Sequence, residues 1–438
     1  MNKPLKRRGL LLVIACIALF LGSLLIPKTK NTPNEEHSPL AQNDRPRQFF
    51  GGITAQDADT AAQSFAQVIQ DKPFTLPTDH KSHPDYQLEW WYLTFVLEDD
   101  NKNEYGLQYT LFRFKPPGSS EVAESNWANT QQWMGHASLH TKTQHYFEER
   151  FAADGVGNAY VNGSPFEAII DDWSWRTSAS SKNHAMFPSS LNLSLKNKNA
   201  SGNSSPSRDH TLALGESVSI DLSLDTSGPF VKQGDNGYSR KTQDERLRSY
   251  YYSQPFINAK GNLLINGKSI GVKGLGWFDH EWTSHLANSE AMGWDWFSIH
   301  LDDGNKVMAF RMHSEQVVQG KEQSQTEDMQ QQLDQEGLDE SHATYITGTF
   351  ISKEGETTTL DDAQLTLTPT RYETIMTKRG VRTMPTSWRI AIPSKALDVT
   401  VTPFKDNQWN DGFMPYYEGR ITVSGSHTGR GYMELTGY

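Results

Sequence analysis

The stretch that decides the fold is Trp90–Asp99, which reads WWYLTFVLED, and it recurs as WDWFSIHLDD at Trp294–Asp303. Both copies open on tryptophan, continue with aromatic and aliphatic residues, and end on an acidic pair. Each copy then leads into a second apolar run, which ends at Arg113 in the first copy and at Arg311 in the second. A strand-turn-strand opening that returns about 200 residues later indicates two domains of the same kind.

The remaining pattern is also typical of β-structure. Short aromatic and β-branched runs alternate with Gly, Asn and Asp, and Asn266-Gly267 lies between the apolar runs Leu263–Ile265 and Ile270–Val272. An Asn-Gly pair between two such runs is a strong signal for a tight hairpin. Long amphipathic helices are missing from the pattern. We therefore expect an all-β protein, with solvated loops at the polar segments Lys196–His210 and Gly320–Ser341.

The length sets the number of domains. A chain of 438 residues is too long for one hydrophobic core. Two consecutive antiparallel barrels are expected, because closure removes the exposed edges of an open sheet, and two open sandwiches are the alternative. We predict a first domain over residues 80–285 and a second over residues 286–438, with a boundary near Thr283–Met292.

The N-terminus predicts export. Lys3, Lys6, Arg7 and Arg8 precede the apolar run Gly9–Ile26. A basic flank before such a run is typical of a signal or membrane anchor with a cytoplasmic N-terminus. We assign residues 1–28 to this segment and 29–79 to a linker, and we expect a bacterial protein anchored in the inner membrane and facing the periplasm.

The only cysteine, Cys16, lies inside the apolar run and is compatible with a lipoprotein cleavage site as an alternative to an anchor. With no other thiol in the chain, a disulfide framework, a cysteine zinc site and a catalytic thiolate are excluded. A net charge of −11 without a basic stripe argues against nucleic acid as a partner. The 12 Trp and 16 Tyr instead suit aromatic-lined cavities.

A series of motifs occurs in a specific order from about residue 83 to the last residue. They are His83–Tyr86, Glu89–Tyr92, Asp171–Trp173, Gly234–Ser239, Tyr250–Ser253, Gly276–Trp282, Gly293–Trp296, Trp388-Arg389, Pro393, Pro403, Tyr417–Gly419 and Gly431–Tyr438. In this order they resemble the AttH and carotenoid 1,2-hydratase (CrtC-like) family. The resemblance implies two consecutive lipocalin-like (calycin) barrels behind an N-terminal signal or anchor, in a family often labelled predicted hydrolases.

The segment Trp277–Trp282 holds the richest candidate site. In an extended strand, Trp277, Asp279 and Glu281 share one face, while Phe278, His280 and Trp282 share the other. If the first face lined an apolar cavity, desolvation and mutual repulsion would raise one carboxyl pKa and leave a neutral acid. Such an acid could protonate an isolated carbon-carbon double bond, and water would complete the addition.

The resemblance implies that Asp279 corresponds to the acid of the carotenoid hydratases. The chain departs from those enzymes at Trp277 and Glu281, where they have tyrosine and asparagine. It also departs at Tyr250–Tyr252, in a region where they use histidine and tryptophan. These differences place the sequence nearer the AttH branch.

We take Asp279, His280 and Glu281 as the candidate catalytic residues, and no cofactor is expected. A structural role is the alternative, in which these side chains hydrogen-bond at the joint between the domains. A metal site built from His280 with a neighbouring carboxylate is not expected, because adjacent strand residues face apart. The candidate ligand-binding residues are Trp90, Trp91, Tyr92, Tyr252, Trp277, Trp282, Trp294 and Trp296.

Other polar residues are assigned structural roles. His83, His136 and His140 are scattered along the sequence and predict no site. Glu89 precedes a tryptophan pair expected to pack in the core, and a second hypothesis makes Glu89 a carboxylate near Asp279. Tyr417-Glu418 and Glu434 are expected to close the second barrel.

Three functions remain open. The first is an exported lipocalin-like protein that binds a hydrophobic or amphipathic ligand, such as a lipid or isoprenoid. The second is a hydratase or hydrolase with Asp279 as general acid, although no Gly-x-Ser-x-Gly elbow supports serine hydrolysis. The third is an accessory subunit of an envelope transporter.

Overall fold

The computed structural model describes residues 65–72, 74–115, 131–153, 158–179, 181, 185–196, 217–243, 245, 247–285, 293–313 and 344–438. These all belong to one compact unit, Pro46–Tyr438. The predicted anchor, Cys16, most of the predicted linker and most of both polar segments lie outside the described residues. Within those ranges the chain forms no helix with the length and apolar character needed to span a bilayer.

The first sheet is antiparallel throughout its described strands, in the order β4-β3-β2-β1-β13-β12-β9-β8-β7-β6-β5, with β10 and β11 added beside β12. The strands are β1 Leu88–Asp99, β2 Glu104–Phe114, β3 Gln132–His140, β4 His145–Ala153, β5 Ala159–Gly163, β6 Phe166–Ile170, β7 Trp173–Thr177, β8 Ser189–Lys196, β9 Ser217–Thr226, β10 Val231–Lys232, β11 Tyr238–Arg240, β12 Arg248–Ile265 and β13 Lys268–His285. The sheet curls until β4 contacts β6 and β8. It therefore forms a barrel.

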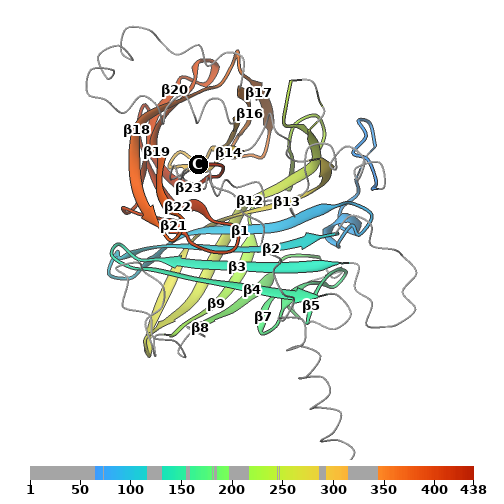
Figure 1. The fold of residues 1–438 in the computed structure, drawn as a ribbon, viewed down its shortest axis with the longest axis vertical. Coiled ribbons are helices and arrows are strands. Elements are labelled where there is room, and N and C mark those ends of the chain that lie inside the picture. The colour runs from blue at the N-terminus through green and yellow to red at the C-terminus, as the bar shows by residue number, and fades with distance from the viewer. Residues whose placement is uncertain are drawn as a thin grey trace, which may run out of the picture. The chain divides into compact units, whose positions relative to one another are not determined.

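The second sheet follows the order β17-β16-β15-β14-β23-β22-β20-β19-β18, with β21 beside β22. Its strands are β14 Gly293–Leu301, β15 Lys306–His313, β16 Thr344–Ile351, β17 Thr357–Asp361, β18 Thr366–Thr377, β19 Gly380–Ile392, β20 Leu397–Pro403, β21 Trp409–Asn410, β22 Tyr416–Gly425 and β23 Gly429–Leu435. Short 3-10 turns occur at η1 Thr78–His80 and η4 Pro393–Lys395. Figure 1 shows these C-terminal strands curling around, and their buried side chains form a second hydrophobic core.

The repeated stretch opens each barrel in the same way. β1 pairs with the next strand, β2, and with the barrel's last strand, β13. β14 likewise pairs with β15 and with its last strand, β23. Each opening strand also supplies a carboxylate to an arginine of the second strand, with Glu89 2.8 Å from Arg113 and Asp295 2.7 Å from Arg311. The prediction of an all-β protein with two lipocalin-like barrels is confirmed.

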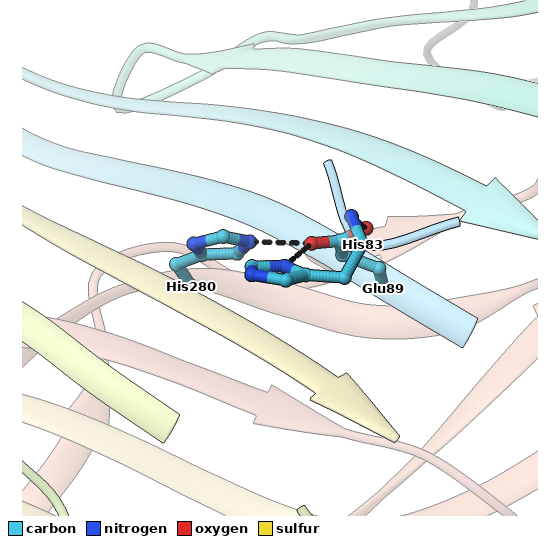
Figure 2. A group of neighbouring side chains, drawn as sticks. All are labelled: His83, Glu89 and His280. Atoms are coloured by element: carbon cyan, nitrogen blue, oxygen red, sulfur yellow. Dashed lines mark hydrogen bonds and ion pairs between the residues drawn. The ribbon is translucent and has the colours of Figure 1, made fainter. Parts of the chain in front are cut away.

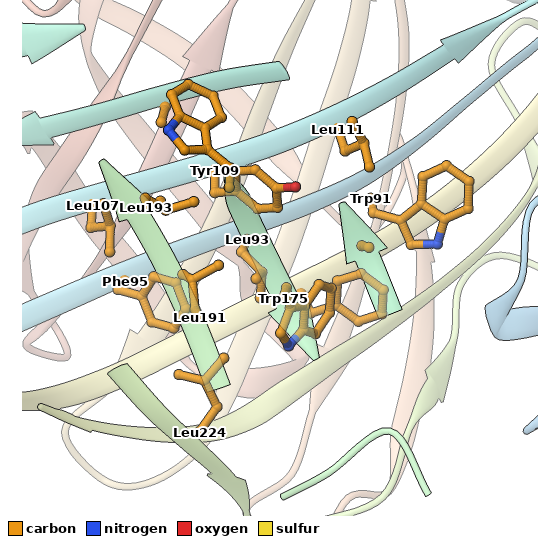
Figure 3. Packing of buried hydrophobic residues seen from close by; sticks show 14 of the residues in the cluster. Trp91, Leu93, Phe95, Leu107, Tyr109, Leu111, Trp175, Leu191, Leu193 and Leu224 are labelled. Atoms are coloured by element: carbon orange, nitrogen blue, oxygen red, sulfur yellow. The ribbon is translucent and has the colours of Figure 1, made fainter. Parts of the chain in front are cut away.

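Side-chain alternation along β1 builds two different cores. Trp91, Leu93 and Phe95 point into the first barrel and pack with β2 residues such as Tyr109 (Figure 3). The opposite face of β1, with Tyr92, joins a separate apolar cluster that includes residues of β14 and β15. Both faces of β1 are therefore buried, one inside the barrel and one against the second sheet.

The chain before β1 packs on the first barrel. Phe65, Val68 and Phe74 are buried, and the carbonyl of His80 accepts a hydrogen bond from the indole of Trp91 at 3.1 Å. Residues from 65 onward, which the sequence assigned to the linker, therefore contribute to the fold.

Candidate functional site

The β12–β13 hairpin positions the candidate site. Asn266 and Gly267 form its turn with φ values of 49° and 81°, which fits a tight turn with two left-handed residues. This turn sets the register of β13 against β12 as far as the Ile257–Gly276 pair, and a bulge between Gln254 and Ile257 then shifts the register by one residue before Asp279 is reached. Along β13, Trp277 joins the apolar cluster between the sheets, whereas Phe278 and Trp282 belong to the core of the first barrel. The expected alternation is present.

A cavity lies between the two sheets, on the Asp279 side of β13. Its volume is about 60 Å³. Its aromatic lining consists of Trp90, Tyr92, Phe112, Phe114, Tyr251, Trp294, Trp296, Phe310 and Tyr416. Its ionisable lining consists of Asp279, Glu281, Glu434 and Lys241. Aliphatic and aromatic walls with a few converging polar groups are typical of small-molecule sites.

The predicted ligand-binding aromatics divide between two places. Trp90, Tyr92, Trp294 and Trp296 line this cavity. Trp91, Tyr252 and Trp282 belong to the core cluster of the first barrel. Trp277 is fully buried, and its indole hydrogen-bonds Asp279.

Asp279 is 2% exposed and accepts three hydrogen bonds. The indole of Trp277 and the hydroxyl of Ser253 donate to Oδ1 at 2.8 and 2.5 Å, and the Tyr251 hydroxyl donates to Oδ2 at 2.8 Å. Burial raises the pKa of Asp279 to about 7, and the Glu281 charge adds to this effect, although the three donors oppose it. Asp279 is therefore a neutral acid over much of the acidic pH range.

Glu281 has a different environment from Asp279. The Lys241 ammonium lies 2.6 Å from its Oε1, and the Ser249 hydroxyl donates to the same oxygen. Lys241 also lies over the rings of Tyr251 and Phe310, at 4.9 and 4.6 Å from their centres. The pocket thus contains one ion pair beside its neutral acid.

Two further acids come from the second barrel, and sequence reasoning had assigned both to structure. Glu434 on β23 accepts a hydrogen bond from the Trp294 indole at 2.7 Å. Burial raises its pKa to about 7, with added repulsion from Asp279 and Glu281. Burial also raises the pKa of Glu418 on β22 well above its usual range. Only the packing of β23 against β1 and of β22 against β2 reveals these positions.

The opposite face of β13 carries a second polar cluster, inside the first barrel (Figure 2). Glu89 Oε1 lies 2.6 Å from His83 Nδ1 and 2.9 Å from His280 Nε2. Glu89 Oε2 accepts from Arg113 at 2.8 Å. Burial opposes the charge on Glu89, but His83 and Arg113 hold its pKa well below its usual range. The hypothesis that places Glu89 near Asp279 is therefore wrong, because the two face opposite sides of the sheet.

The cluster continues through Tyr252. His280 Nδ1 lies 3.0 Å from the Tyr252 hydroxyl, which lies 2.6 Å from His80 Nδ1. Burial lowers the pKa of His280 to about 4 and that of His80 to about 3, so both are neutral at pH 7. Burial also disfavours the charge on His83, but Glu89 and Asp79 raise its pKa above the ordinary value. His83, which the sequence left without a role, is thus part of a buried network.

His83, Glu89 and His280 are close enough to hold a metal ion. Two observations favour a hydrogen-bonded network instead. Both imidazoles are at hydrogen-bond distance from a single carboxylate oxygen, and the Arg113 guanidinium pairs with the other oxygen. A fixed cation at that distance would repel a metal ion. The contacts described here are those of a hydrogen-bonded network around Glu89.

Fold and pocket together define a class: a double lipocalin-like β-barrel protein with an aromatic and acidic cavity between its barrels. A family model described as AttH-like matches residues 67–341 and 323–438, and the chain belongs to the AttH-like family, as the sequence motifs indicated.

Two solved structures are similar to this chain. The crystal structure of an AttH protein from Nitrosomonas europaea, NE1406, has a TM-score of 0.65 and 26% identity, covering 85% of this chain and 100% of its own. Kievitone hydratase from Nectria haematococca has a TM-score of 0.53 and 15% identity, covering 85% and 96%. No curated protein matches the sequence.

Proposed function

We propose that the protein binds a small, largely apolar or amphipathic molecule, such as a lipid or isoprenoid, in the cavity between the barrels. The observation that carries this proposal is the composition of the cavity. Aromatic rings from both barrels converge there with two carboxyls whose pKa values are raised to about 7. A neutral carboxyl can donate a hydrogen bond to a hydroxyl or carbonyl group without the cost of burying a charge.

The ligand's polar end would lie at the acidic wall. The Lys241–Glu281 pair and the acids Asp279 and Glu434 define that wall. Trp90 and Trp294 are only half-buried and would contact the apolar part. The expected N-terminal anchor would place this cavity on the periplasmic side of a bacterial inner membrane, where amphipathic molecules are abundant. The transporter-subunit hypothesis gains no support from the described contacts.

A neutral fluorescent probe, N-phenyl-1-naphthylamine, tests the proposal on the full chain. Met414 lines the cavity and is 5% exposed, so Met414→Trp should fill the space and abolish probe fluorescence. Met376 is 66% exposed, and Met376→Trp is the matched control that should bind the probe normally. Equal binding by both variants, with circular dichroism showing both folded, would refute binding in this cavity. Native mass spectrometry of protein extracted from its own envelope would then identify the ligand.

The raised pKa of Asp279 favours a second function, the hydration of a carbon-carbon double bond. The Asp279 proton would pass to one alkene carbon, and a water oxygen would bond to the resulting carbocation. That water would return a proton to the Asp279 carboxylate, so the net change is the addition of one water. The electron-rich faces of Trp90, Trp294 and Trp296 would stabilise the cation.

Incubation with acyclic carotenoids and other acyclic isoprenoids tests this second function. Mass spectrometry should detect a product heavier by one water with the native chain and none with Asp279→Asn. Asp411→Asn, at a site away from the cavity lining, is the control that should retain the activity. A protein that leaves every such alkene unchanged while still binding the probe would be a carrier and not a hydratase.

A further inference from the structure

Exposed apolar side chains gather around the β18–β19 hairpin and the loop that follows β21. Eight large hydrophobic side chains are exposed in the described part of the chain, and five belong to this group: Phe151, Tyr372, Met376, Val381 and Phe413. We call these five residues the apolar patch. Met376 and Val381 pair directly across the hairpin, and Tyr372 lies four residues before Met376 on the same face of β18. Exposed apolar clusters of this kind mark interaction surfaces.

Listed contacts aside, the patch is connected through the tip of the hairpin. The Arg379 guanidinium at the tip donates to the Phe413 carbonyl at 3.0 Å. The Lys378 amide donates to the Asp411 carboxylate of the same loop at 3.2 Å. The Phe413 ring then packs edge-on against Phe151 of β4, with 5.7 Å between the ring centres. The apolar patch therefore includes side chains of both barrels.

The hairpin is basic, although the whole chain has a net charge of −11. Residues 371–382 contain four basic residues, Arg371, Lys378, Arg379 and Arg382, and a single acid, Glu373. The side chains of Arg371 and Lys378 are 60% and 56% exposed, and each lies 3.7 Å from one carboxylate. Positive charge next to exposed apolar side chains is the combination that binds the interface of an anionic bilayer.

We propose that the apolar patch and the basic residues beside it dock on an anionic phospholipid bilayer. The apolar side chains would enter the boundary between headgroups and acyl chains, while the basic groups would contact the lipid phosphates. The use of this contact rests on the proposed function. Phe413 is followed by Met414, which lines the cavity, so docking would place the cavity beside a store of amphipathic molecules. The docking itself depends only on the surface.

A bilayer fits this surface better than a second copy of the chain does. A two-fold contact through the patch would bring the same basic residues of two chains together, and like charges oppose association. Anionic headgroups neutralise these charges instead. Each basic residue near such a surface contributes about fivefold to the ratio of docked to undocked protein.

Quenching of a fluorescent label by lipid tests the docking on the full chain. The chain has one native cysteine, so Cys16→Ser gives a background in which single cysteines carry nitrobenzoxadiazole. With vesicles of phosphatidylcholine and phosphatidylglycerol, spin-labelled lipid should quench the label at Met376→Cys and at Phe151→Cys. Leu264→Cys, exposed on β12 and outside the patch, is the control that should stay unquenched. Quenching requires contact with lipid, so it separates docking from tethering by an N-terminal anchor.

The charge of the hairpin is tested by Lys378→Gln. This substitution should lower the ratio of quenched to unquenched label at Met376→Cys about fivefold. Lys353→Gln is the matched control, because Lys353 is also exposed and also lies 3.7 Å from a carboxylate, and it should leave the ratio unchanged. Equal quenching in the two lysine variants would overturn the assignment to an anionic surface.

Two further results would overturn the docking. One is a label at Met376→Cys and Phe151→Cys that stays as unquenched as at Leu264→Cys. The other is a blue shift of the label that appears without lipid and grows with protein concentration, because a second copy would then cover the patch. Met414→Trp fills the cavity and should dock normally. A chain that docks but does not bind N-phenyl-1-naphthylamine would therefore refute the proposed ligand and not the bilayer contact.

Discussion

Asp279 and His280 are consecutive residues of β13, yet their side chains belong to separate hydrogen-bond networks on opposite faces of the strand. Asp279 contacts Tyr251 and Ser253 at the cavity between the barrels, and His280 contacts Glu89 and Tyr252 inside the first barrel. Burial acts on both in the same sense, because it favours the uncharged form of each. It raises the pKa of Asp279 to about 7 and lowers that of His280 to about 4.

The raised pKa of Asp279 predicts a pH-dependent contribution to stability. Between its ordinary value of 3.8 and about 7, the folded state binds a proton that the unfolded state releases, so stability falls as pH rises. Asp279→Asn removes this contribution. Urea unfolding at pH 4 and pH 7.5 gives the free energy of unfolding at each pH. On going from pH 4 to pH 7.5, this free energy should rise by roughly 4 kcal/mol in the variant relative to the native chain. A pH-independent difference would contradict the prediction. Asp398→Asn is the control: Arg389 lowers the pKa of Asp398 below its ordinary value of 3.8, so this pH range should change the contribution of Asp398 little.

The buried pair of Glu89 and Arg113 predicts a large loss of stability on substitution. Both side chains are fully buried, so Glu89→Gln would leave the Arg113 charge without its partner. Chemical denaturation should show a loss of roughly 3–5 kcal/mol. Arg389 and Asp398 form a pair on the exposed surface, where Arg389→Gln should change stability little. Equal losses of stability in the two variants would mean that the Glu89 carboxylate is not needed to balance the charge of Arg113.

The pKa values of three histidines in the first barrel should be shifted in opposite directions. His83 should become charged at a pH above 6.5, whereas His280 and His80 should remain neutral down to about pH 4 and pH 3. His83 therefore stabilises the fold below pH 6.5 and loses this effect as pH rises through its own pKa. The contribution of neutral His280 and His80 to the stability of the fold is lost as pH falls below 6.5, because the unfolded state then binds protons that the folded state does not. Nitrogen NMR of the imidazoles at pH 5.5, assigned with single His→Gln variants, should find only His83 of the three charged.

A glycine at the junction of the barrels should not tolerate a side chain. A Cβ on Gly106 would lie 2.9 Å from the Cβ of Arg420 and 2.7 Å from the hydroxyl of Tyr432. The Arg420 guanidinium donates to the carbonyls of Leu97 and Tyr105 at 3.0 and 3.1 Å, and these bonds hold β22 against the first barrel.

Gly106→Ala should therefore cost about 1–3 kcal/mol in thermal or urea unfolding. Gly271→Ala is the matched control, because its Cβ would meet nothing closer than 3.9 Å, and it should be neutral or slightly stabilising. If both variants had the same unfolding midpoint as the native chain, the junction would be looser than these contacts indicate.

Local patterns in the sequence predicted the parts of the fold that depend on neighbouring residues. The repeat at Trp90 and Trp294 predicted two barrels, because each copy opens its sheet in the same way. The Asn266-Gly267 pair predicted the hairpin, because its residues tolerate the left-handed conformation that the turn needs. Strand periodicity predicted which side chains of Trp277–Trp282 share a face.

Pairing between distant segments could not be predicted in this way. Glu89 and His280 are 191 residues apart, and Tyr92 and Glu418 are 326 apart. Their contact depends on β1 pairing with β13 and on how the second barrel packs against the first. Glu418 and Glu434 were therefore assigned to barrel closure, and His83 was given no role. A carboxylate's pKa depends on burial, which a sequence pattern does not show.

β1 pairs with β13 without a register shift from Leu88 to Asp99, whereas a bulge interrupts the β12–β13 pairing between the Asn266-Gly267 turn and Asp279. The pairing with β1 therefore decides what both compartments contain. If β13 slipped by a single residue against its neighbours, His280 would face the second barrel and Asp279 the interior of the first. Neither set of polar groups can be repositioned along the strand without displacing the other. A change of chemistry in either compartment is therefore reached by exchanging side chains at fixed positions of β13, as long as its pairing with β1 is kept.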